Sequence, residues 1–404
     1  MTASLPHIIL LSHDLQELQN CGSKSGVGEA HLIDVEGGSP EVVHLSPLAK
    51  PGATRGRQVL PLKWHLNGGQ MPESATARVD PEAMVWIDTN ATPAVARCNL
   101  HLDDAWVLEH PVDIIQTGSV AFTRNAPILE TPALNEASVL CIGLGSGGSI
   151  VADQLARAGV GRFTLWDMDR LESHNIGRHL CTSRDLGRRK VFAVRDHIKA
   201  VNPVAEVKCI DKDVLQTRGP SDELESEILE ADCVIVGTDN NRSRFAINEA
   251  AWHHRKIALY GRAFKRAAGG DVIQVIPAQT PCYACHVGKR VVEEEISSAR
   301  DVERVAYADT VVPIEPGLNV DIHPIANMIA RLALLRLCEN LESSLKKVAK
   351  ETRAPLYLWA NRREGQFSSW QPMEHSYDRL AILRWYAVRV PSNKECMTCG
   401  FSQY

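Results

Sequence analysis

Residues Val139-Leu-Cys-Ile-Gly-Leu-Gly-Ser-Gly-Gly-Ser-Ile150 form an apolar run that ends in the pattern Gly143-x-Gly145-x-x-Gly148. A strand that enters such a turn and continues as a helix presents backbone N–H groups and the positive end of a helix dipole, which together bind phosphate. The pattern therefore predicts a nucleotide site. It leaves the nucleotide open, because NAD-dependent dehydrogenases, flavoproteins and ATP-dependent enzymes share it.

Composition excludes several classes of protein. The 404 residues are 44% hydrophobic and 23% charged, which is typical of a globular chain with two or three domains. Apolar runs are shorter than the about 20 residues that cross a bilayer, and the first residues do not resemble a signal peptide, so we expect a cytoplasmic protein without membrane contact. A net charge of -5 argues against a nucleic-acid partner. Eleven cysteines, several of them in apolar runs, argue against a disulfide framework.

From residue 138 onward the pattern alternates between strands and helices. Strand-like runs cover 138–142, 162–166, 205–210, 233–237 and 256–260, with helical stretches between them. This order predicts a doubly wound, Rossmann-like α/β fold with a mostly parallel sheet. Further along we expect a strand at 271–276, a helix over 324–347 and a hairpin over 354–371.

Residues 1–125 differ from the rest of the chain. Short apolar pieces such as His7–Ser12 and Ala83–Ile87 are separated by clusters of glycine, proline and serine. They predict a smaller N-terminal accessory domain, either α+β or β-rich, without a catalytic constellation. Residues 126–404 would form the second domain.

Two cysteine pairs share the C-x-x-C spacing. Four thiolates from Cys282, Cys285, Cys396 and Cys399 would complete a tetrahedral structural zinc site and join distant parts of the chain. The alternatives are a redox-active pair, which the presence of two copies disfavours, and unconnected surface thiols.

Acidic and basic motifs follow the second strand of the α/β region. Asp167 lies nineteen residues after Gly148, where a carboxylate can bind a ribose hydroxyl. The next motifs lie within 169–178, 185–190 and 238–244, and a hydride-transfer site does not require them.

These ordered motifs resemble the ThiF/MoeB/HesA superfamily, which includes the ubiquitin-activating enzymes. The resemblance covers residues 120–404 and rests on the glycine loop, D-x-D, S-x-N-x-x-R, D-x-G-x-x-K, D-N-x-x-x-R and the C-x-x-C pairs. It implies a zinc-containing ThiF/MoeB adenylation domain over 126–404, with a crossover at 286–322. The implied reaction is attack of a C-terminal glycine carboxylate on the α-phosphate of ATP.

The resemblance also assigns roles to residues. It implies that Arg178 and Lys190 contact the phosphates and that Asn175 is a neutral donor beside them, since adenylyl transfer concentrates negative charge on phosphate oxygens. Asp239 would ligate Mg²⁺, and Asp167 would hold the ribose. The remaining nucleotide-binding positions in the matched motifs are Gly143, Gly145, Gly148, Asp169 and Asn240.

Two positions depart from the family pattern. Gly177 stands where the family usually has a second asparagine. Arg124 matches an arginine that family dimers insert into the neighbouring subunit's site, although it lies closer than usual to Gly143. We therefore expect a homodimer with Arg124 as a catalytic residue in the partner's site.

The step after adenylation is open in the sequence. Activating enzymes generally carry a thioester cysteine in or just after the crossover, and here Cys338 is the only cysteine between Cys285 and Cys396, in a helical, core-like context. We expect direct acyl transfer to a partner. The alternatives are an oxyester on Thr310 and a thioester on Cys181.

The leading functional hypothesis is a bacterial-type activating enzyme that adenylates a ubiquitin-like protein and passes it to a conjugating enzyme, with docking at the N-terminal domain. Its layout is similar to that of family enzymes in bacterial conjugation and antiviral-defence operons. Alternatives within the family are a peptide-modifying adenylase of natural-product biosynthesis and a sulfur-carrier adenylyltransferase. An NAD-dependent oxidoreductase and a catalytically inactive scaffold are alternatives from other classes.

Overall fold

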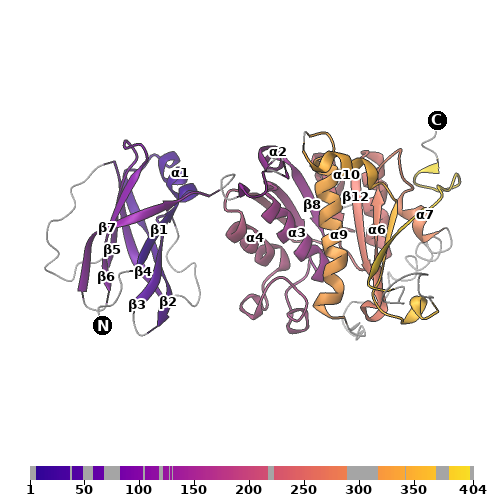
Figure 1. Cartoon of the computed structure of the whole chain (residues 1–404), viewed down its shortest axis with the longest axis horizontal. Coiled ribbons are helices and arrows are strands. Elements are labelled where there is room, and N and C mark those ends of the chain that lie inside the picture. Colours follow the sequence, from indigo (N-terminus) through magenta and orange to yellow (C-terminus); the bar gives the residue numbers. More distant parts are fainter. Residues whose placement is uncertain are drawn as a thin grey trace. The chain divides into compact units, whose positions relative to one another are not determined.

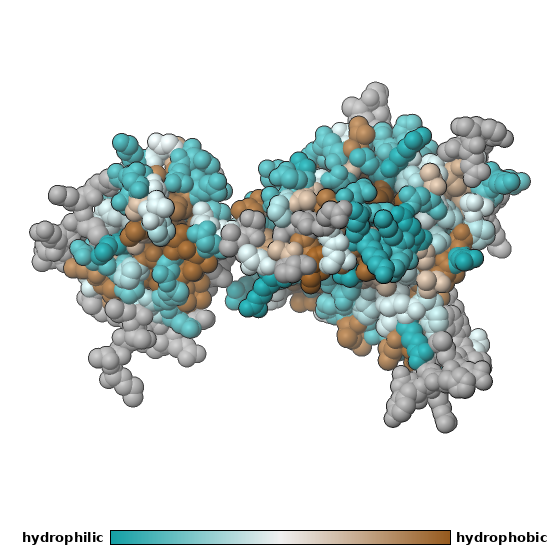
Figure 2. Space-filling view, turned by 45° about the horizontal axis from the view of Figure 1, so that its top comes forward, coloured by the Kyte–Doolittle hydropathy of each residue, from teal (hydrophilic) through white to brown (hydrophobic). Residues whose placement is uncertain are grey.

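The computed structural model describes residues 6–36, 39–48, 58–67, 82–102, 105–117, 122–126, 128–129, 131–216, 223–288, 317–341, 343–369 and 382–400. The chain divides into two compact units, Met1–Ala121 and Phe122–Tyr404. Of the helices in these ranges, none combines the length and the apolar character that spanning a membrane requires. Figure 2 shows a largely hydrophilic surface on the second unit, interrupted by small hydrophobic patches.

The first unit is a closed β-barrel with the strand order β1-β3-β2-β4-β5-β6-β7. Alternate side chains such as Ile8 and Leu10, or Val85 and Ile87, point into its core and are almost fully buried. The barrel agrees with the expected β-rich N-terminal domain. Its elements are β1 (His7–Leu11), α1 (Ser12–Asn20), β2 (Ser25–Glu36), β3 (Ser39–Ser46), β4 (Gln58–Leu66), β5 (Ala83–Asp88), β6 (Val95–Leu102) and β7 (Ala105–Ile115).

The second unit is built on a mixed sheet with the order β10-β9-β8-β11-β12-β13-β14-β15. Strands β10 to β12 run parallel in the doubly wound order, and β13 to β15 continue the sheet antiparallel. The strands are β8 (Ser138–Ile142), β9 (Arg162–Trp166), β10 (Glu206–Ile210), β11 (Cys233–Val236), β12 (Ile257–Ala263), β13 (Gly269–Val275), β14 (Leu356–Ala360) and β15 (Arg384–Val388).

Helices cover both faces of this sheet (Figure 1). Helices α3, α4 and α9 pack on one face, and α5, α6 and α7 pack on the other. Successive residues of β8 are therefore buried on opposite sides, which explains why the strand is apolar from Val139 to Ile142. The helices are α2 (Thr131–Glu136), α3 (Ser146–Ala158), α4 (Lys190–Val201), α5 (Glu223–Glu230), α6 (Asn241–His253), α7 (Tyr283–Val287), α9 (Asn319–Leu337) and α10 (Leu345–Glu351). Short 3₁₀ turns are η2 (Ser173–Asn175), η3 (Ser183–Asp185), η4 (Lys265–Ala267) and η6 (Gly365–Phe367).

The structure corrects three expected boundaries. Strand β12 extends to Ala263 because it pairs antiparallel with β13 beyond its parallel contact with β11. The helix expected over 324–347 is instead α9, which begins before Pro324, and the separate α10. The hairpin expected over 354–371 is wrong, because β14 pairs antiparallel with β13 on one side and β15 on the other, and both partners lie outside that range.

Candidate nucleotide site and cysteine cluster

The candidate nucleotide site lies at the carboxyl ends of the parallel strands. The strand order reverses direction between β8 and β11, and ligands of open α/β sheets bind at such a switch point. A pocket of about 170 Å³ opens there. Its lining includes the predicted residues Gly143, Gly145, Asp167, Asp169, Lys190, Asp239 and Asn240.

The three glycines of the loop have different surroundings. Gly143 has a φ of 87° and packs against the chain after β11, where a Cβ would lie 2.6 Å from the Gly237 carbonyl carbon. A Cβ on Gly148 would lie only 2.0 Å from the Gly143 oxygen. At Gly145, by contrast, a Cβ would meet no atom within 4 Å. Gly143 and Gly148 therefore allow the loop and α3 to pack closely, and Gly145 leaves open space beside the N-terminus of α3, as a bound phosphate requires.

Asp167 holds this loop through its carboxylate. Its two oxygens accept hydrogen bonds from the backbone N–H of Leu144, at 2.6 Å, and of Asp169, at 2.8 Å. Burial raises the pKa of the Asp167 carboxyl above its usual value, although nearby Lys190 and the two N–H groups oppose that rise. The side chain lines the pocket, so ribose binding by Asp167 fits its position and stays a prediction.

Lys190 supplies a cation to the same pocket. It is the first residue of α4 and is only 8% exposed, and its Nζ donates to Asp169 Oδ2 at 2.8 Å. The Asp169 side chain is 55% exposed. The Lys190 ammonium therefore lies at the pocket, where it could contact a phosphate.

Asp239 and Asn240 lie in the segment between β11 and α6. Asp239 is exposed at the pocket, and an accessible carboxylate beside a phosphate site fits the preference of Mg²⁺ for one or two carboxylates plus phosphate oxygens. The Asn240 side chain caps α6, because its Oδ1 accepts from the Ser243 N–H at 2.8 Å. The capping role of Asn240 was not expected from the sequence.

Asn175 and Arg178 lie in the turn after β9 and are partly buried. Asn175 closes the turn η2, since its Oδ1 accepts from the Glu172 N–H at 2.9 Å and its carbonyl accepts from Arg178 and His179. Neither Asn175 nor Arg178 is part of the pocket lining described above. Their predicted contacts with phosphate stay predictions.

His179 was not predicted as a site residue from the sequence. Its position directly after Arg178 was the one signal for it. The buried imidazole makes a 2.7 Å hydrogen bond to the Leu144 carbonyl in the glycine loop. Burial lowers its pKa. The contact joins residues 35 positions apart, so no local pattern could have shown it.

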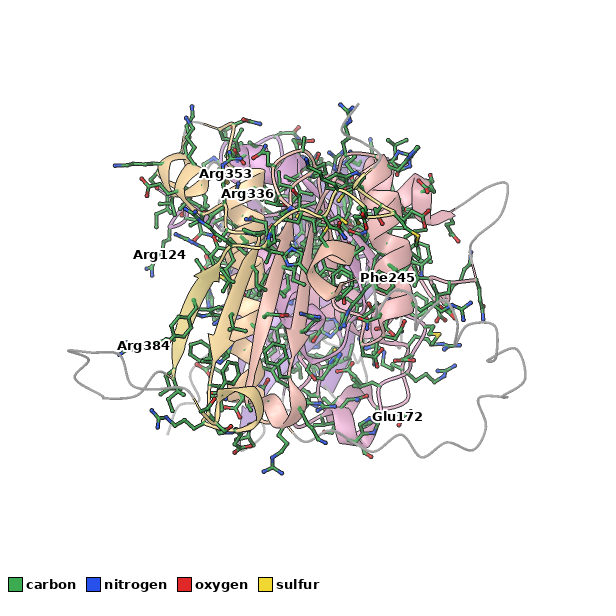
Figure 3. All side chains as sticks on the ribbon, turned by 90° about the vertical axis from the view of Figure 1, so that its right-hand side faces the viewer. Arg124, Glu172, Phe245, Arg336, Arg353 and Arg384 are labelled. Atoms are coloured by element: carbon green, nitrogen blue, oxygen red, sulfur yellow. The ribbon has the colours of Figure 1, made fainter. Side chains whose placement is uncertain are left out.

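Arg124 is exposed in the short turn that precedes α2, and in Figure 3 it lies well apart from Glu172, which follows β9. It does not belong to the pocket lining of its own chain. Insertion of Arg124 into a second subunit stays a prediction. Thr310 and residues 289–316 of the expected crossover lie outside the described residues.

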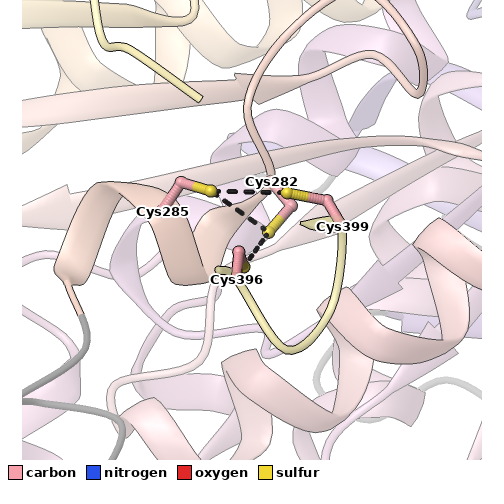
Figure 4. Close-up of side chains that lie close together, drawn as sticks. All are labelled: Cys282, Cys285, Cys396 and Cys399. Carbon is pink, nitrogen blue, oxygen red and sulfur yellow. Dashed lines mark hydrogen bonds between the residues drawn. The ribbon is translucent and has the colours of Figure 1, made fainter. Parts of the chain in front are cut away.

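The four predicted zinc ligands converge (Figure 4). Their sulfur atoms all lie within 4.8 Å of one another, with Cys282–Cys396 at 3.5 Å and Cys285–Cys399 at 3.4 Å. Tetrahedral Zn–S bonds of about 2.3 Å place sulfurs about 3.8 Å apart, so this donor set fits zinc. The Cys282 thiol donates to the Cys285 sulfur and lowers the pKa of the Cys285 thiol, which favours a thiolate in the cluster.

The remaining cysteines of the second unit do not offer an exposed thiol near the pocket. Cys338 is fully buried in the core, and Cys181 is 5% exposed, with burial raising the pKa of its thiol to about 12. Cys209 is partly buried, and burial raises its pKa as well. The exposed Cys21 belongs to the barrel unit. A thioester on Cys181 is therefore disfavoured.

A larger cavity of about 950 Å³ lies at the other end of α6, beside the cysteine cluster. Its lining includes Trp252, Arg255, Met397 and Cys399, and none of the predicted nucleotide-binding residues takes part. The smaller pocket is therefore the candidate nucleotide site, because the glycine loop, the N-terminus of α3 and Lys190 meet there.

Comparison with known proteins gives consistent matches. Curated relatives include ubiquitin-like modifier-activating enzyme 5 of Caenorhabditis elegans, 28% identical over 173 residues, or 41% of each chain. A probable molybdopterin-synthase adenylyltransferase of Porphyra purpurea is 32% identical over 133 residues, which are 33% of this chain and 34% of that protein. The chain thus spans well under two thirds of the length of these relatives.

Among solved structures, a crystal structure of E. coli MccB with AMPCPP and MccA aligns with a TM-score of 0.46 at 17% identity. The alignment covers 67% of this chain and 68% of MccB. Residues 123–374 match the model of the ThiF family, and this range is more than half of the sequence. The chain therefore belongs to the ThiF family.

Proposed function

We propose that this protein uses ATP to adenylate the C-terminal glycine carboxylate of a ubiquitin-like protein. The observation that carries the proposal is the pocket in which the open face of Gly145, the N-terminus of α3 and the Lys190 ammonium converge. This combination suits a polyphosphate, whose charge the fixed backbone dipoles and the cation stabilise. The similarity to ubiquitin-like modifier-activating enzyme 5 supports the choice of substrate.

In the proposed reaction, a carboxylate oxygen of the substrate attacks the α-phosphorus of ATP. A new P–O bond forms, the bond between the α-phosphorus and the bridging oxygen breaks, and pyrophosphate leaves with the electron pair. Lys190 and Arg178 would balance the charge on the phosphate oxygens, and Asp167 would orient the ribose. Mg²⁺ held by Asp239 would supply further positive charge, and zinc in the cysteine cluster would be structural.

The acyl group would then pass directly to a partner. Every cysteine in Phe122–Tyr404 is buried or partly buried, so this unit lacks an exposed thiol for an internal thioester. We propose a conjugating enzyme, in a bacterial-type conjugation pathway, as the acceptor. The barrel, Met1–Ala121, is our candidate for docking such a partner.

Exchange of labelled pyrophosphate into ATP tests the adenylation step. We expect exchange that requires a Gly-ending ubiquitin-like protein and disappears when its terminal glycine is removed. Lys190→Ala should lower the rate of exchange at least 100-fold. The control is Lys199→Ala, which replaces an exposed lysine of the same helix and should leave the rate unchanged. Absence of exchange with all Gly-ending candidates would contradict the proposal.

Intact mass spectrometry tests the hand-over. Direct transfer predicts an adenylated substrate without a covalent adduct on the enzyme. An adduct that thiols release would show a cysteine nucleophile, and one that only hydroxylamine releases would favour an oxyester such as that on Thr310.

A second candidate function is activation of a sulfur-carrier protein. The similarity to a probable molybdopterin-synthase adenylyltransferase favours it. Both functions share the adenylation chemistry and differ in the acceptor. Formation of a thiocarboxylate on the Gly-ending protein in the presence of a sulfur donor would support this alternative, and transfer to a conjugating enzyme would support the first.

A further inference from the structure

The peptide groups on both sides of Leu144, in the middle of the glycine loop, are held by side chains from elsewhere in the fold. The N–H of Leu144 donates to Asp167 Oδ2 at 2.6 Å, and its carbonyl oxygen lies 2.7 Å from His179 Nε2. The Leu144 side chain itself is fully buried. The loop between Gly143 and Gly145 is therefore fixed in orientation before any ligand binds.

The hydrogen-bond partners define the protonation state of His179. The backbone N–H of Cys181 donates to Nδ1 at 3.0 Å, so Nδ1 must be unprotonated and act as the acceptor. The ring proton then sits on Nε2, which donates to the Leu144 carbonyl. The imidazole is 7% exposed, and burial lowers its pKa, so the neutral form with this tautomer is favoured.

This imidazole connects the glycine loop with the segment that carries Arg178, which the sequence places apart. Its neighbour on one side is Arg178, and on the other side the Leu180 N–H donates to Ser149 Oγ in the first turns of α3, at 3.4 Å. The segment that carries Arg178 is thus attached at two points to the glycine loop and its helix. A shift of the segment would move the loop carbonyl as well.

We propose that His179 is a positioning residue that aligns the backbone N–H groups of the glycine loop and the Arg178 guanidinium on one polyphosphate chain. The proposal rests on the proposed function, because it assumes that ATP binds at this loop. His179 does not contact the nucleotide. Its donation to the Leu144 carbonyl fixes the distance between the two phosphate-binding elements.

Two substitutions separate the two hydrogen bonds of the ring. In His179→Gln, the amide nitrogen can take the place of Nε2 and keep the bond to Leu144, while the acceptor for Cys181 is lost. In His179→Asn, the amide oxygen can take the place of Nδ1 and keep the bond from Cys181, while the shorter side chain cannot reach Leu144. Each variant loses one hydrogen bond, so each serves as the control for the other.

The test is calorimetric binding of a non-hydrolysable ATP analogue and of adenosine to the full chain, with the unfolding temperature measured for each variant. We expect His179→Asn to bind the analogue about tenfold more weakly and His179→Gln to stay within about twofold of the unchanged protein. Adenosine, which has no phosphates to align, should bind equally to all three proteins.

Several results would overturn the proposal. It is wrong if His179→Asn binds the analogue as tightly as the unchanged protein, or if both variants lose affinity for adenosine and the analogue by the same factor, as general loosening of the fold would cause. If His179→Asn does not fold, the test rests on His179→Gln. The proposal is then wrong if this variant binds the analogue more than tenfold more weakly than the unchanged protein. If the unchanged protein binds the analogue and the variants match it, only the role of His179 falls. If the unchanged protein binds neither compound, the proposed function falls as well.

Discussion

Replacing Gly145 or Gly148 by alanine adds the same methyl group at two points of one loop, and the structure predicts opposite consequences. At Gly148 the new Cβ would lie 2.0 Å from the Gly143 carbonyl oxygen, so backbone must move. Such overpacking costs about 1–3 kcal/mol, and contact with backbone places it near the upper end. The better helix propensity of alanine offsets at most about 1 kcal/mol, which leaves about 2 kcal/mol of lost stability.

At Gly145 the backbone has a φ of −71°, which alanine adopts freely, and a Cβ would have no neighbour within 4 Å. The free energy of unfolding should therefore change by less than about 0.5 kcal/mol. The added methyl group would instead occupy the open face of the pocket where a phosphate would approach. We expect affinity for an ATP analogue to fall at least tenfold.

Thermal unfolding and calorimetric binding of the analogue check both substitutions. For a unit of this size, about 2 kcal/mol corresponds to a melting temperature about 4–8 °C lower for Gly148→Ala. Gly145→Ala should melt within about 2 °C of the unchanged protein. The assignment of roles within the loop would be refuted if Gly145→Ala bound the analogue normally, or if it lost as much stability as Gly148→Ala.

Three further predictions concern other parts of the molecule. We expect one bound zinc ion per chain, which metal analysis of the purified protein would measure. Cys396→Ser should lose this ion and unfold at a lower temperature. An unchanged metal content would show that the cluster is not a zinc site. Asp239→Asn should raise the Mg²⁺ concentration that half-maximal pyrophosphate exchange requires by at least tenfold, and an unchanged requirement would remove Asp239 as the Mg²⁺ ligand. Burial alone would raise the pKa of Asp14, but hydrogen bonds with His13 and His44 outweigh it and lower that pKa. A carboxyl pKa that is lowered by folding contributes stability above the unfolded value near 3.8, and this stability is lost as the pH falls through the folded value. The urea concentration needed to unfold the barrel should therefore decrease below about pH 4 in the unchanged protein, and should decrease less in Asp14→Asn.

The parallel part of the fold was predictable because its signals are local. Strands β8 and β9 match the predicted ranges 138–142 and 162–166, since each is an apolar run bounded by glycine or by an acidic residue. The four-cysteine cluster was predictable because the C-x-x-C spacing occurs twice. In both cases short-range sequence decided the structure.

The remaining features depend on contacts between distant residues. The pairing of β14 with β15 crosses a long connection, so the apolar pattern alone suggested a hairpin in the wrong place. The role of His179 depends on a loop 35 residues earlier, and the pairing of Lys190 with Asp169 spans 21 residues. The closed barrel of the first unit follows from strand pairings that alternating patterns do not specify.

During synthesis on the ribosome, Cys282 emerges 114 residues ahead of Cys396. At about 5–20 residues per second, this interval lasts about 6–23 seconds. The residues of the glycine loop and of strands β8 to β13 have already been synthesised by then, whereas those of β14, β15 and the second cysteine pair have not. Two thiols do not complete a four-sulfur site, so zinc would reach its final affinity only after Cys399 has emerged. Uptake of the metal would then mark the moment at which the last strands of the sheet become fixed to the part that carries the glycine loop.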